Sequence, residues 1–312
     1  MKVPMTDEAL ADTPSEAPRR PSVLRGLVRT ARPHQWTKNV LVGAAPLAAG
    51  KVFHTGVLVH TALAFVAFCL AASGTYLVND AMDVEADRQH PTKRNRPVAA
   101  GVVSVPLAIG VGATLMAGAL GLALGATTGK FALVLVAYVG MTLAYSLWLK
   151  HQPVIDLACV SGGFTLRAAG GGTAASLHIS RWFLIVSAFG ALFMIAGKRY
   201  AELLRIGEGS HHTRKALAGY TLGYLRFVWE VAVAIMIMAY CLWAFEVDGH
   251  HRTSTPWALL SVVPFVLAVL RYALDVEAGR AESPDRIVLS DRGLQALGIA
   301  WAALFALGAF GV

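Results

Sequence analysis

The most constraining feature of this sequence is a series of apolar runs, each about 18 to 22 residues long, that are separated by short polar connections. At a rise of about 1.5 Å per residue, a helix of this length crosses a hydrocarbon core of about 30 Å. The connections near residues 57, 128 and 151 are too short to hold a further domain, so we expect one all-α membrane domain over residues 22–312. Nine transmembrane helices are predicted, at about residues 38–56, 58–78, 104–126, 130–149, 153–172, 180–199, 220–244, 256–275 and 291–311.

The composition agrees with an integral membrane protein. Hydrophobic residues make up 56% of the chain, charged residues only 15%, and the mean hydropathy is +0.56, which is far from the values of soluble domains. Residues 1–21 have no apolar core, so we expect a disordered cytoplasmic tail and not a cleaved secretory signal. The three cysteines, Cys69, Cys159 and Cys241, fall within apolar runs without disulfide or metal spacing, and we interpret them as packing residues.

Lysine and arginine are distributed unevenly between the two sides of this predicted bundle. With the N-terminus inside, 22 of the 27 fall on the cytoplasmic side, four fall on the opposite side and one, Arg167, falls within a helix. This bias predicts a cytoplasmic N-terminus and an external C-terminus. The net charge of +8 therefore lies mainly on one face, where it favours anionic lipids and phosphate substrates. No nucleic-acid recognition motif accompanies it, so nucleic-acid binding is not expected.

A sharply polar segment, NDAMDVEADRQHPTKRNRP, follows the second apolar run. Asn79, Asp83 and Asp87 are spaced by four residues, so they would share one face of a helix that continued out of the run, with Asp80 beside them. Oxygen ligands in this arrangement suit Mg²⁺ bound together with a diphosphate. The alternative is a helix that turns polar at the lipid headgroups, with basic residues as a topology signal. The basic residues that would hold the remaining phosphate oxygens are Arg88, Lys93, Arg94 and Arg96.

Other polar segments fall on the same predicted side. RPHQWTKN, which contains Lys38, precedes the first run, and RYALDVEAGRAESPDR follows the eighth. The alternative for each is a helix end with snorkelling basic residues and interfacial aromatic residues, and it is as strong as a functional role for RPHQWTKN but weaker for the second segment. The segment GKRYAELLR, after the sixth run, contains four further candidates: Lys198, Arg199, Tyr200 and Glu202.

Arg167 lies in the middle of the fifth run, in SGGFTLRAAGGG. A guanidinium in hydrocarbon costs at least about 2.5 kcal/mol, so we expect Arg167 to face a polar cavity. It could form an ion pair with Asp156, or line a cavity that binds an anionic substrate; we favour the cavity. The neighbouring glycines are interpreted as positions of close helix packing, because no strand precedes them as it would in a phosphate loop.

Taken together, these motifs resemble the UbiA-type superfamily of intramembrane prenyltransferases, in which a polar Asn-xxx-Asp-xxx-Asp motif follows the second of nine helices and a second polar motif follows the sixth. Four longer segments are similar to a narrower group, the decaprenyl-phosphate phosphoribosyltransferases: NDAMDVEADRQHPTKRNRPVAAG, WFLIVSAFGALFMIAGKRYAEL, YLRFVW and LRYALDVEAG. The resemblance runs from about Arg32 to the C-terminus. Typical superfamily members carry an acidic Asp-xxx-Asp as the second motif, whereas this chain has Lys198 to Glu202 there.

The resemblance implies an enzyme that transfers 5-phosphoribose from 5-phosphoribosyl 1-diphosphate to decaprenyl phosphate or another polyprenyl phosphate. The products would be decaprenylphosphoryl-β-ribose 5-phosphate, a precursor of cell-wall arabinan, and diphosphate. It also implies the plasma membrane of a bacterium, with the active site on the cytoplasmic side.

The implied site residues follow the two motifs. Mg²⁺ would be held by Asp83 and Asp87, with Asn79 and Asp80 assisting, and the diphosphate by Lys93, Arg94 and Arg96. The ribose and its 5-phosphate would be bound by Lys198, Arg199, Tyr200 and Glu202. Arg167 and Lys38 are candidates for the acceptor phosphate or the cavity wall.

Two other functions remain open. One is an ordinary prenyltransferase that joins a prenyl diphosphate to an aromatic acceptor, and the missing second acidic motif disfavours it. The other is a transporter or lipid flippase, which the absence of a clear internal repeat disfavours. The sequence leaves open the acceptor chain length, the number of Mg²⁺ ions and whether the chain forms homo-oligomers.

Overall fold

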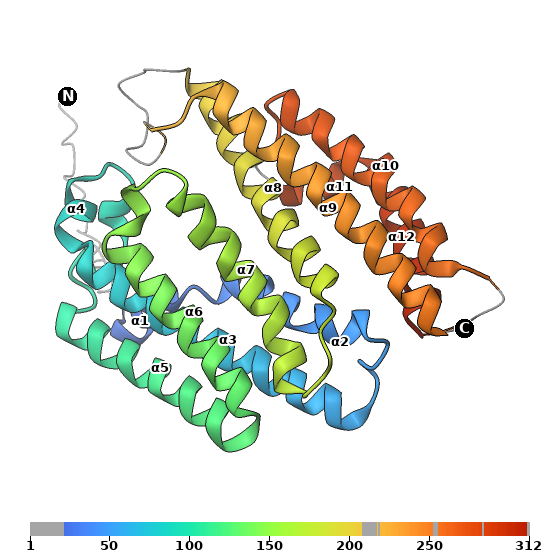
Figure 1. Ribbon diagram of the computed structural model, residues 1–312. Helices are drawn as coiled ribbons and strands as arrows, with labels where there is room; N and C mark the ends of the chain where they lie inside the picture. Colours follow the sequence, from blue (N-terminus) through green and yellow to red (C-terminus); the bar gives the residue numbers. More distant parts are fainter. Residues whose placement is uncertain (1–21, 208–216, 218, 252–254, 283, 311–312) are drawn as a thin grey trace, which may run out of the picture.

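The computed structural model describes residues 22–207, 217, 219–251, 255–282 and 284–310 (Figure 1). The predicted tail, residues 1–21, lies outside the described residues. Within the described part the regular elements are, in order, α1 (Val23–Ala31), η1 (Pro33–Gly43), α2 (Ala44–Ala48), α3 (Thr55–Met82), α4 (Val84–Gln89), η2 (Lys93–Asn95), α5 (Val105–Ala126), α6 (Gly129–Leu147), η3 (Leu149–His151), α7 (Ile155–Ala174), α8 (Arg181–Ile206), α9 (Leu222–His251), α10 (Trp257–Glu277), α11 (Pro284–Ser290) and α12 (Arg292–Phe310), where η marks a 3₁₀-helix.

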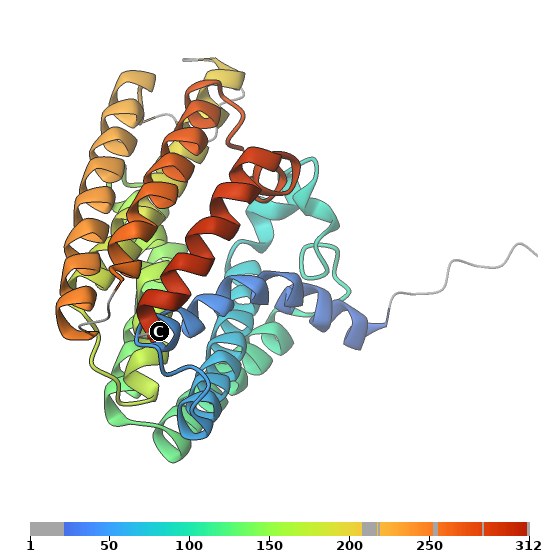
Figure 2. The same ribbon diagram turned by 90° about the vertical axis from the view of Figure 1, so that its right-hand side faces the viewer.

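The long helices form two groups that meet at α7 and α8. In one group α3 packs against α5 and α6, and α6 packs against α7; in the other, α8 packs against α9 and α10 against α12 (Figure 1). The N-terminal segment α1–η1–α2 crosses the first group and contacts α3 and α7 (Figure 2). α4 and the C-terminal ends of α6 and α8 lie toward the same end of the bundle, so the polar motifs gather there (Figure 1).

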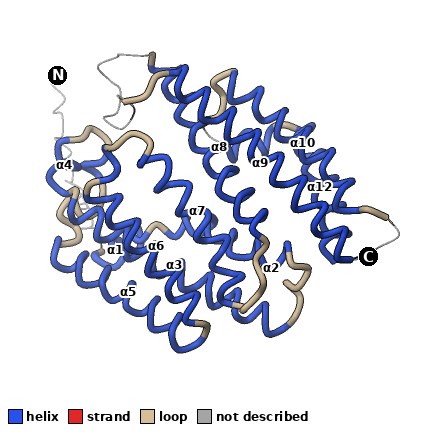
Figure 3. The backbone as a smooth tube through the Cα atoms, in the orientation of Figure 1, coloured by secondary structure: helices blue, strands red, loops and turns tan. Residues whose placement is uncertain are grey.

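The all-α prediction is confirmed, since no strand occurs among the described residues (Figure 3). By length and apolar composition, seven of the described helices are able to span a membrane: α3, α5, α6, α8, α9, α10 and α12. The predicted count of nine is therefore not confirmed. α7 is long enough, but its glycines, Asp156 and Arg167 make it less apolar, and it packs between α6, α8 and η1.

The first predicted helix, residues 38–56, is wrong as a single element. The chain instead forms the 3₁₀-helix η1, the five-residue α2 and a turn at Gly50, whose φ is +63°. Pro46 lies within α2, and a Cβ at residue 50 would stand 2.1 Å from the carbonyl oxygen of Ala309. Apolar character alone did not reveal this break, because residues 40–49 contain no charged side chain.

Glycine allows the two closest backbone approaches that position the site. A Cβ on Gly171 would lie 1.7 Å from the carbonyl oxygen of Val42, so η1 rests directly on the backbone of α7. A Cβ on Gly74 would lie 2.6 Å from the carbonyl oxygen of Gly112, where α3 crosses α5. The small-residue interpretation is thus confirmed at Gly171, and the contact brings the polar residues of η1 beside those of α7.

Candidate functional site

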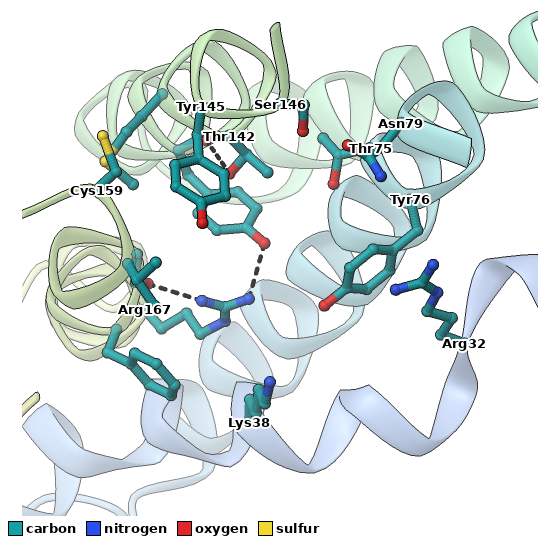
Figure 4. A pocket seen from close by; sticks show the side chains of 15 residues that line it. Arg32, Lys38, Thr75, Tyr76, Asn79, Thr142, Tyr145, Ser146, Cys159 and Arg167 are labelled. Carbon is teal, nitrogen blue, oxygen red and sulfur yellow. Dashed lines mark hydrogen bonds between the residues drawn. The ribbon is translucent and has the colours of Figure 1, made fainter. Parts of the chain in front are cut away.

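A cavity of about 300 Å³ lies between η1, α3, α6 and α7 (Figure 4). Three cationic side chains line it: Arg32, Lys38 and Arg167. Tyr76 and Asn79 line it from α3, and apolar side chains of α6 and α7 form part of its wall. Figure 4 shows Arg167 and Lys38 facing the same open space, with Arg32 on the far side beside Tyr76. This is a cavity suited to an anionic ligand with an apolar part.

Arg167 is held in the cavity wall by three neutral groups. Its Nε donates to Asn39 Oδ1 at 2.7 Å, one terminal nitrogen donates to the Tyr138 hydroxyl at 2.7 Å, and the other donates to the carbonyl oxygen of Gly163 at 2.9 Å. The side chain is buried, and its guanidinium stands 4.7 Å from the Tyr138 ring centroid. The alternative ion pair with Asp156 does not form, since none of these partners is a carboxylate.

Asp156 belongs to a different network at the end of α7. It accepts a hydrogen bond from the Tyr145 hydroxyl at 2.7 Å and pairs with Arg199 of α8 at 3.2 Å. Arg199 also stands 3.8 Å from Glu202, one turn farther along α8. The network therefore joins α6, α7 and the second polar motif, and Tyr145 reaches from it to the cavity wall.

The acidic segment leaves α3 with a break that the sequence pattern did not reveal. α3 ends at Met82, Asp83 has φ −86° and ψ 7°, and α4 begins at Val84. The four-residue hydrogen bonds nevertheless continue, from Asp83 N to Asn79 O at 2.9 Å and from Asp87 N to Asp83 O at 2.8 Å. The helix is thus interrupted in its dihedrals while the spacing of the three side chains is kept.

Basic residues hold the carboxylates of this segment in pairs. Arg96 donates to Asp80 at 3.2 Å and to Asp87 at 2.7 Å, so one guanidinium bridges both. Arg32 also donates to Asp80, at 2.7 Å. Asp80 and Asp87 are each 2% exposed, which makes these buried charge pairs.

The other basic residues of the segment are more peripheral. Lys93 Nζ stands 4.0 Å from Asp87, and Arg94 is exposed. Asp83 is paired with Lys150 of η3 at 2.8 Å. Asn79 lines the cavity from the last turns of α3, so it links the cavity to the acidic segment.

The donor set of this segment fits Mg²⁺ in chemistry, because the carboxylates and the amide of Asn79 offer the hard oxygen ligands that this ion prefers. Among the described residues, no group of three or more His, Cys, Asp or Glu side chains stands together in a form that could hold a metal. The carboxylates face cations instead, at Arg32, Arg96 and Lys150. Metal binding together with a phosphate ligand would therefore exchange these partners.

The structure separates the members of the second polar motif. Lys198 is exposed and forms no ion pair within the described chain, and it lies within electrostatic range of Lys38. Tyr200 is 3% exposed, packs against Trp229, and its hydroxyl accepts a hydrogen bond from Arg226 at 3.0 Å. Its ring therefore belongs to the core between α8 and α9, whereas Lys198 is exposed and Arg199 is paired with Asp156 beside the cavity wall.

Residues 39–290 match the UbiA prenyltransferase family. The chain belongs to this family. It is 50% identical over 279 residues to decaprenyl-phosphate phosphoribosyltransferase of Corynebacterium glutamicum, in an alignment that covers 88% of this chain and 84% of that relative. It is 49% identical over 290 residues to the protein of the same name from Mycobacterium tuberculosis, with 90% and 93% covered.

Solved structures show the same UbiA fold. A structure of digeranylgeranylglyceryl phosphate synthase superposes with a TM-score of 0.67 at 15% identity, covering 93% of this chain and 99% of that one. A UbiA homolog from Archaeoglobus fulgidus, bound to DMAPP and Mg²⁺, superposes with a TM-score of 0.62 at 18% identity, covering 92% and 99%. The helical arrangement around the cavity is therefore that of the UbiA family.

Sequence reasoning missed several contributors to this site, among them Arg32, which lines the cavity and pairs with Asp80. Asn39 and Tyr138 hold Arg167, Tyr145 holds Asp156, and Lys150 pairs with Asp83. A signal existed for the two tyrosines, because positions seven apart on a helix share a face. Lys150 gave no such signal, since 67 residues separate it from its partner.

Proposed function

We propose that this protein transfers 5-phosphoribose from 5-phosphoribosyl 1-diphosphate to decaprenyl phosphate. The observation that carries the proposal is the cationic cavity beside an acidic segment, in a chain about half identical to decaprenyl-phosphate phosphoribosyltransferases over most of its length. The reaction forms a C1–O–P bond to the acceptor phosphate and breaks the C1–O bond to diphosphate, which leaves with the electron pair.

The donor diphosphate would lie at the acidic segment. Asp83 and Asp87, with Asn79 and Asp80, would hold Mg²⁺, which supplies charge neutralisation to the departing diphosphate. Arg96 and Lys150 pair with these carboxylates in the structure. When the donor binds, both would contact the phosphate oxygens instead, together with Lys93 and Arg94. Binding of the donor thus replaces one set of ion pairs by another.

The ribose 5-phosphate would be bound at the start of the second motif. Lys198 has no ion-pair partner in the described chain, and Arg199 stands at the edge of the site. A basic pair here, in place of a second acidic motif, provides direct contact with a third phosphate group, which a prenyl diphosphate lacks. We assign Glu202 to orienting Arg199, and Tyr200 to orienting this end of α8 through Arg226.

The acceptor phosphate is already an anion at neutral pH, so the protein needs no general base and acts mainly by alignment and charge. A single displacement inverts C1, from the α-configured donor to a β-linked product. The product would serve cell-wall arabinan synthesis in a bacterial plasma membrane, with the site on the cytoplasmic side.

The test is a transfer assay with the purified protein in detergent. With Mg²⁺, decaprenyl phosphate and labelled 5-phosphoribosyl 1-diphosphate, we expect a lipid-extractable β-linked product and release of diphosphate. A parallel reaction with a prenyl diphosphate and an aromatic acceptor tests the wider UbiA activity. Transfer only in the second reaction, or an α-linked product by NMR, would overturn the proposal.

A further inference from the structure

The two cations at the α7 end of the cavity form a binding site of their own. We propose that Arg167 and Lys38 bind the phosphate of the lipid acceptor, and that Asn39 is the positioning residue for Arg167. This inference rests on the proposed transfer reaction and assigns the acceptor subsite within it.

Arg167 has hydrogen-bonding capacity left for a ligand. Its guanidinium carries five N–H donors, and the structure uses three of them, toward Asn39, Tyr138 and Gly163. The side chain is only 6% exposed, and what is accessible faces the cavity (Figure 4). Two N–H donors of a buried guanidinium therefore remain for a ligand in the cavity that it lines, and a phosphate is the ligand that guanidinium groups bind best.

The positive charge at this end has no counter-anion in the described chain. All three partners of Arg167 are neutral, and Lys38 forms no hydrogen bond or ion pair there. Arg32, Arg96, Lys150 and Arg199 are each paired with a carboxylate. Arg167 is buried, and an unpaired buried charge is costly, so an anion in the cavity would stabilise it. Lys38 is exposed and adds a second positive charge to the same open space.

The cavity wall beside these cations favours the acceptor over the donor. Met141, Val160 and Phe164 line it, and they suit the first unit of a polyprenyl chain attached to a phosphate. The donor has no apolar part, and the acidic segment that suits its metal-bound diphosphate lies toward the Asn79 end. The two substrates would therefore approach each other across one cavity.

Asn39 fixes Arg167 without neutralising it. It is fully buried; its Oδ1 accepts from Arg167, and its Nδ2 donates to Cys69 Sγ at 3.2 Å. An aspartate here would have nearly the same shape but would pair with the guanidinium as a charge. Asn39→Asp should therefore weaken an anion site while the contact geometry is kept.

The experiment measures binding without turnover. Farnesyl phosphate, a short soluble polyprenyl phosphate, is titrated into the wild type, Lys38→Gln and Asn39→Asp by calorimetry, without Mg²⁺ or donor. Farnesol reports the contribution of the tail alone, and Lys130→Gln, at the opposite end of α6, is the matched lysine control. Binding of the donor with Mg²⁺ is measured on the same samples, and thermal melting checks that the variants are folded.

We expect each site variant to bind farnesyl phosphate roughly tenfold more weakly or worse, as loss of a charge-assisted contact implies. Farnesol and donor affinity should change less than about threefold, and Lys130→Gln should match the wild type. Unchanged farnesyl phosphate affinity in Lys38→Gln, which removes a group without a protein partner, would overturn the proposal. So would an equal loss of donor affinity, because the cations would then serve the donor. Transfer by the wild type is measured in the separate assay described above. Absence of transfer would overturn the proposed reaction, whereas unchanged farnesyl phosphate binding in the variants would overturn only this subsite.

Discussion

At the residue scale, the two aspartates proposed to hold Mg²⁺ have different surroundings. Asp83 is partly exposed and paired with a single lysine, whereas Asp87 is buried and bridged to Asp80 through Arg96. We expect Asp83→Asn and Asp87→Asn each to lower Mg²⁺-dependent transfer by roughly 100-fold, because each removes one charge from the site. Only Asp87→Asn should also destabilise the protein, by about 1 to 3 kcal/mol, since it weakens a buried pair.

Transfer rates, Mn²⁺ binding by EPR and thermal melting measure these effects together. Glu85→Gln is the matched control, because Glu85 is an exposed carboxylate on α4 that pairs with Arg88. It should leave all three readings unchanged. Near-normal transfer by either aspartate variant would show that the metal assignment is wrong.

At the element scale, η3 supplies one of the cations that pair with the acidic segment. It follows α6 directly and brings Lys150 to Asp83, with Nζ–O distances of 2.8 and 3.1 Å. We expect Lys150→Gln to strengthen Mn²⁺ binding without donor, since a competing cation is removed. Donor affinity in the presence of metal should fall roughly tenfold, because a phosphate contact is lost.

EPR titration of Mn²⁺ and calorimetry with the donor measure these two opposite changes. Arg29→Gln, which removes an exposed cation of α1 that is not assigned to the site, controls for net charge. Weaker Mn²⁺ binding in Lys150→Gln would contradict the exchange of partners proposed for this element.

The start of α12 gives a pH-dependent prediction. Asp291 accepts hydrogen bonds from Gly293 N and Leu294 N, and from Arg271 of α10 at 2.7 Å; the Arg271 hydrogen bond and then the backbone bonds hold the pKa of its carboxyl below its usual value. A lowered folded-state pKa stabilises the protein above the unfolded value, about 3.9, and this contribution is lost as pH falls through the folded value. We expect Asp291→Asn, which keeps the capping ability, to reduce the loss of melting temperature below pH 4. An unchanged acid dependence, compared by melting curves of the two proteins, would contradict this.

How far the sequence predicts each element depends on its surroundings. α3, α5, α6, α8, α9, α10 and α12 follow from length and hydropathy, because the bilayer requires both. η1 does not follow from them, because its position depends on the close approach of the Val42 backbone to Gly171 of α7. The break at Asp83 does not either, because the Asp83 carboxylate is paired with Lys150, which is distant in the sequence. Arg167 was identifiable as a cavity residue from its cost in hydrocarbon, but its partner Asn39 lies 128 residues away.

At the scale of the whole molecule, the polar motifs share one end of the bundle and the basic residues share one predicted side (Figure 1). If this end is cytoplasmic, residue 51 lies outside, because it precedes α3, whose C-terminal end is at the cytoplasmic side. Residue 22 then lies inside only when the segment α1–η1–α2 crosses the membrane. Hydropathy does not decide this crossing, because the segment is absent from the seven candidate spans of the described chain. The number of crossings beyond these seven therefore depends on the N-terminal segment and on α7.

Single cysteines in a cysteine-free background resolve the topology. We expect Lys51→Cys and Lys130→Cys to react with a membrane-impermeant maleimide in intact cells, and Arg94→Cys and Ser22→Cys to react only after lysis. Reaction of Ser22→Cys in intact cells, with Lys51→Cys also reactive, would mean that α1–η1–α2 enters and leaves by the same face. Reaction of Arg94→Cys in intact cells would place the acidic segment outside. This result would contradict the distribution of basic residues, 22 against four, which predicts that the segment is cytoplasmic.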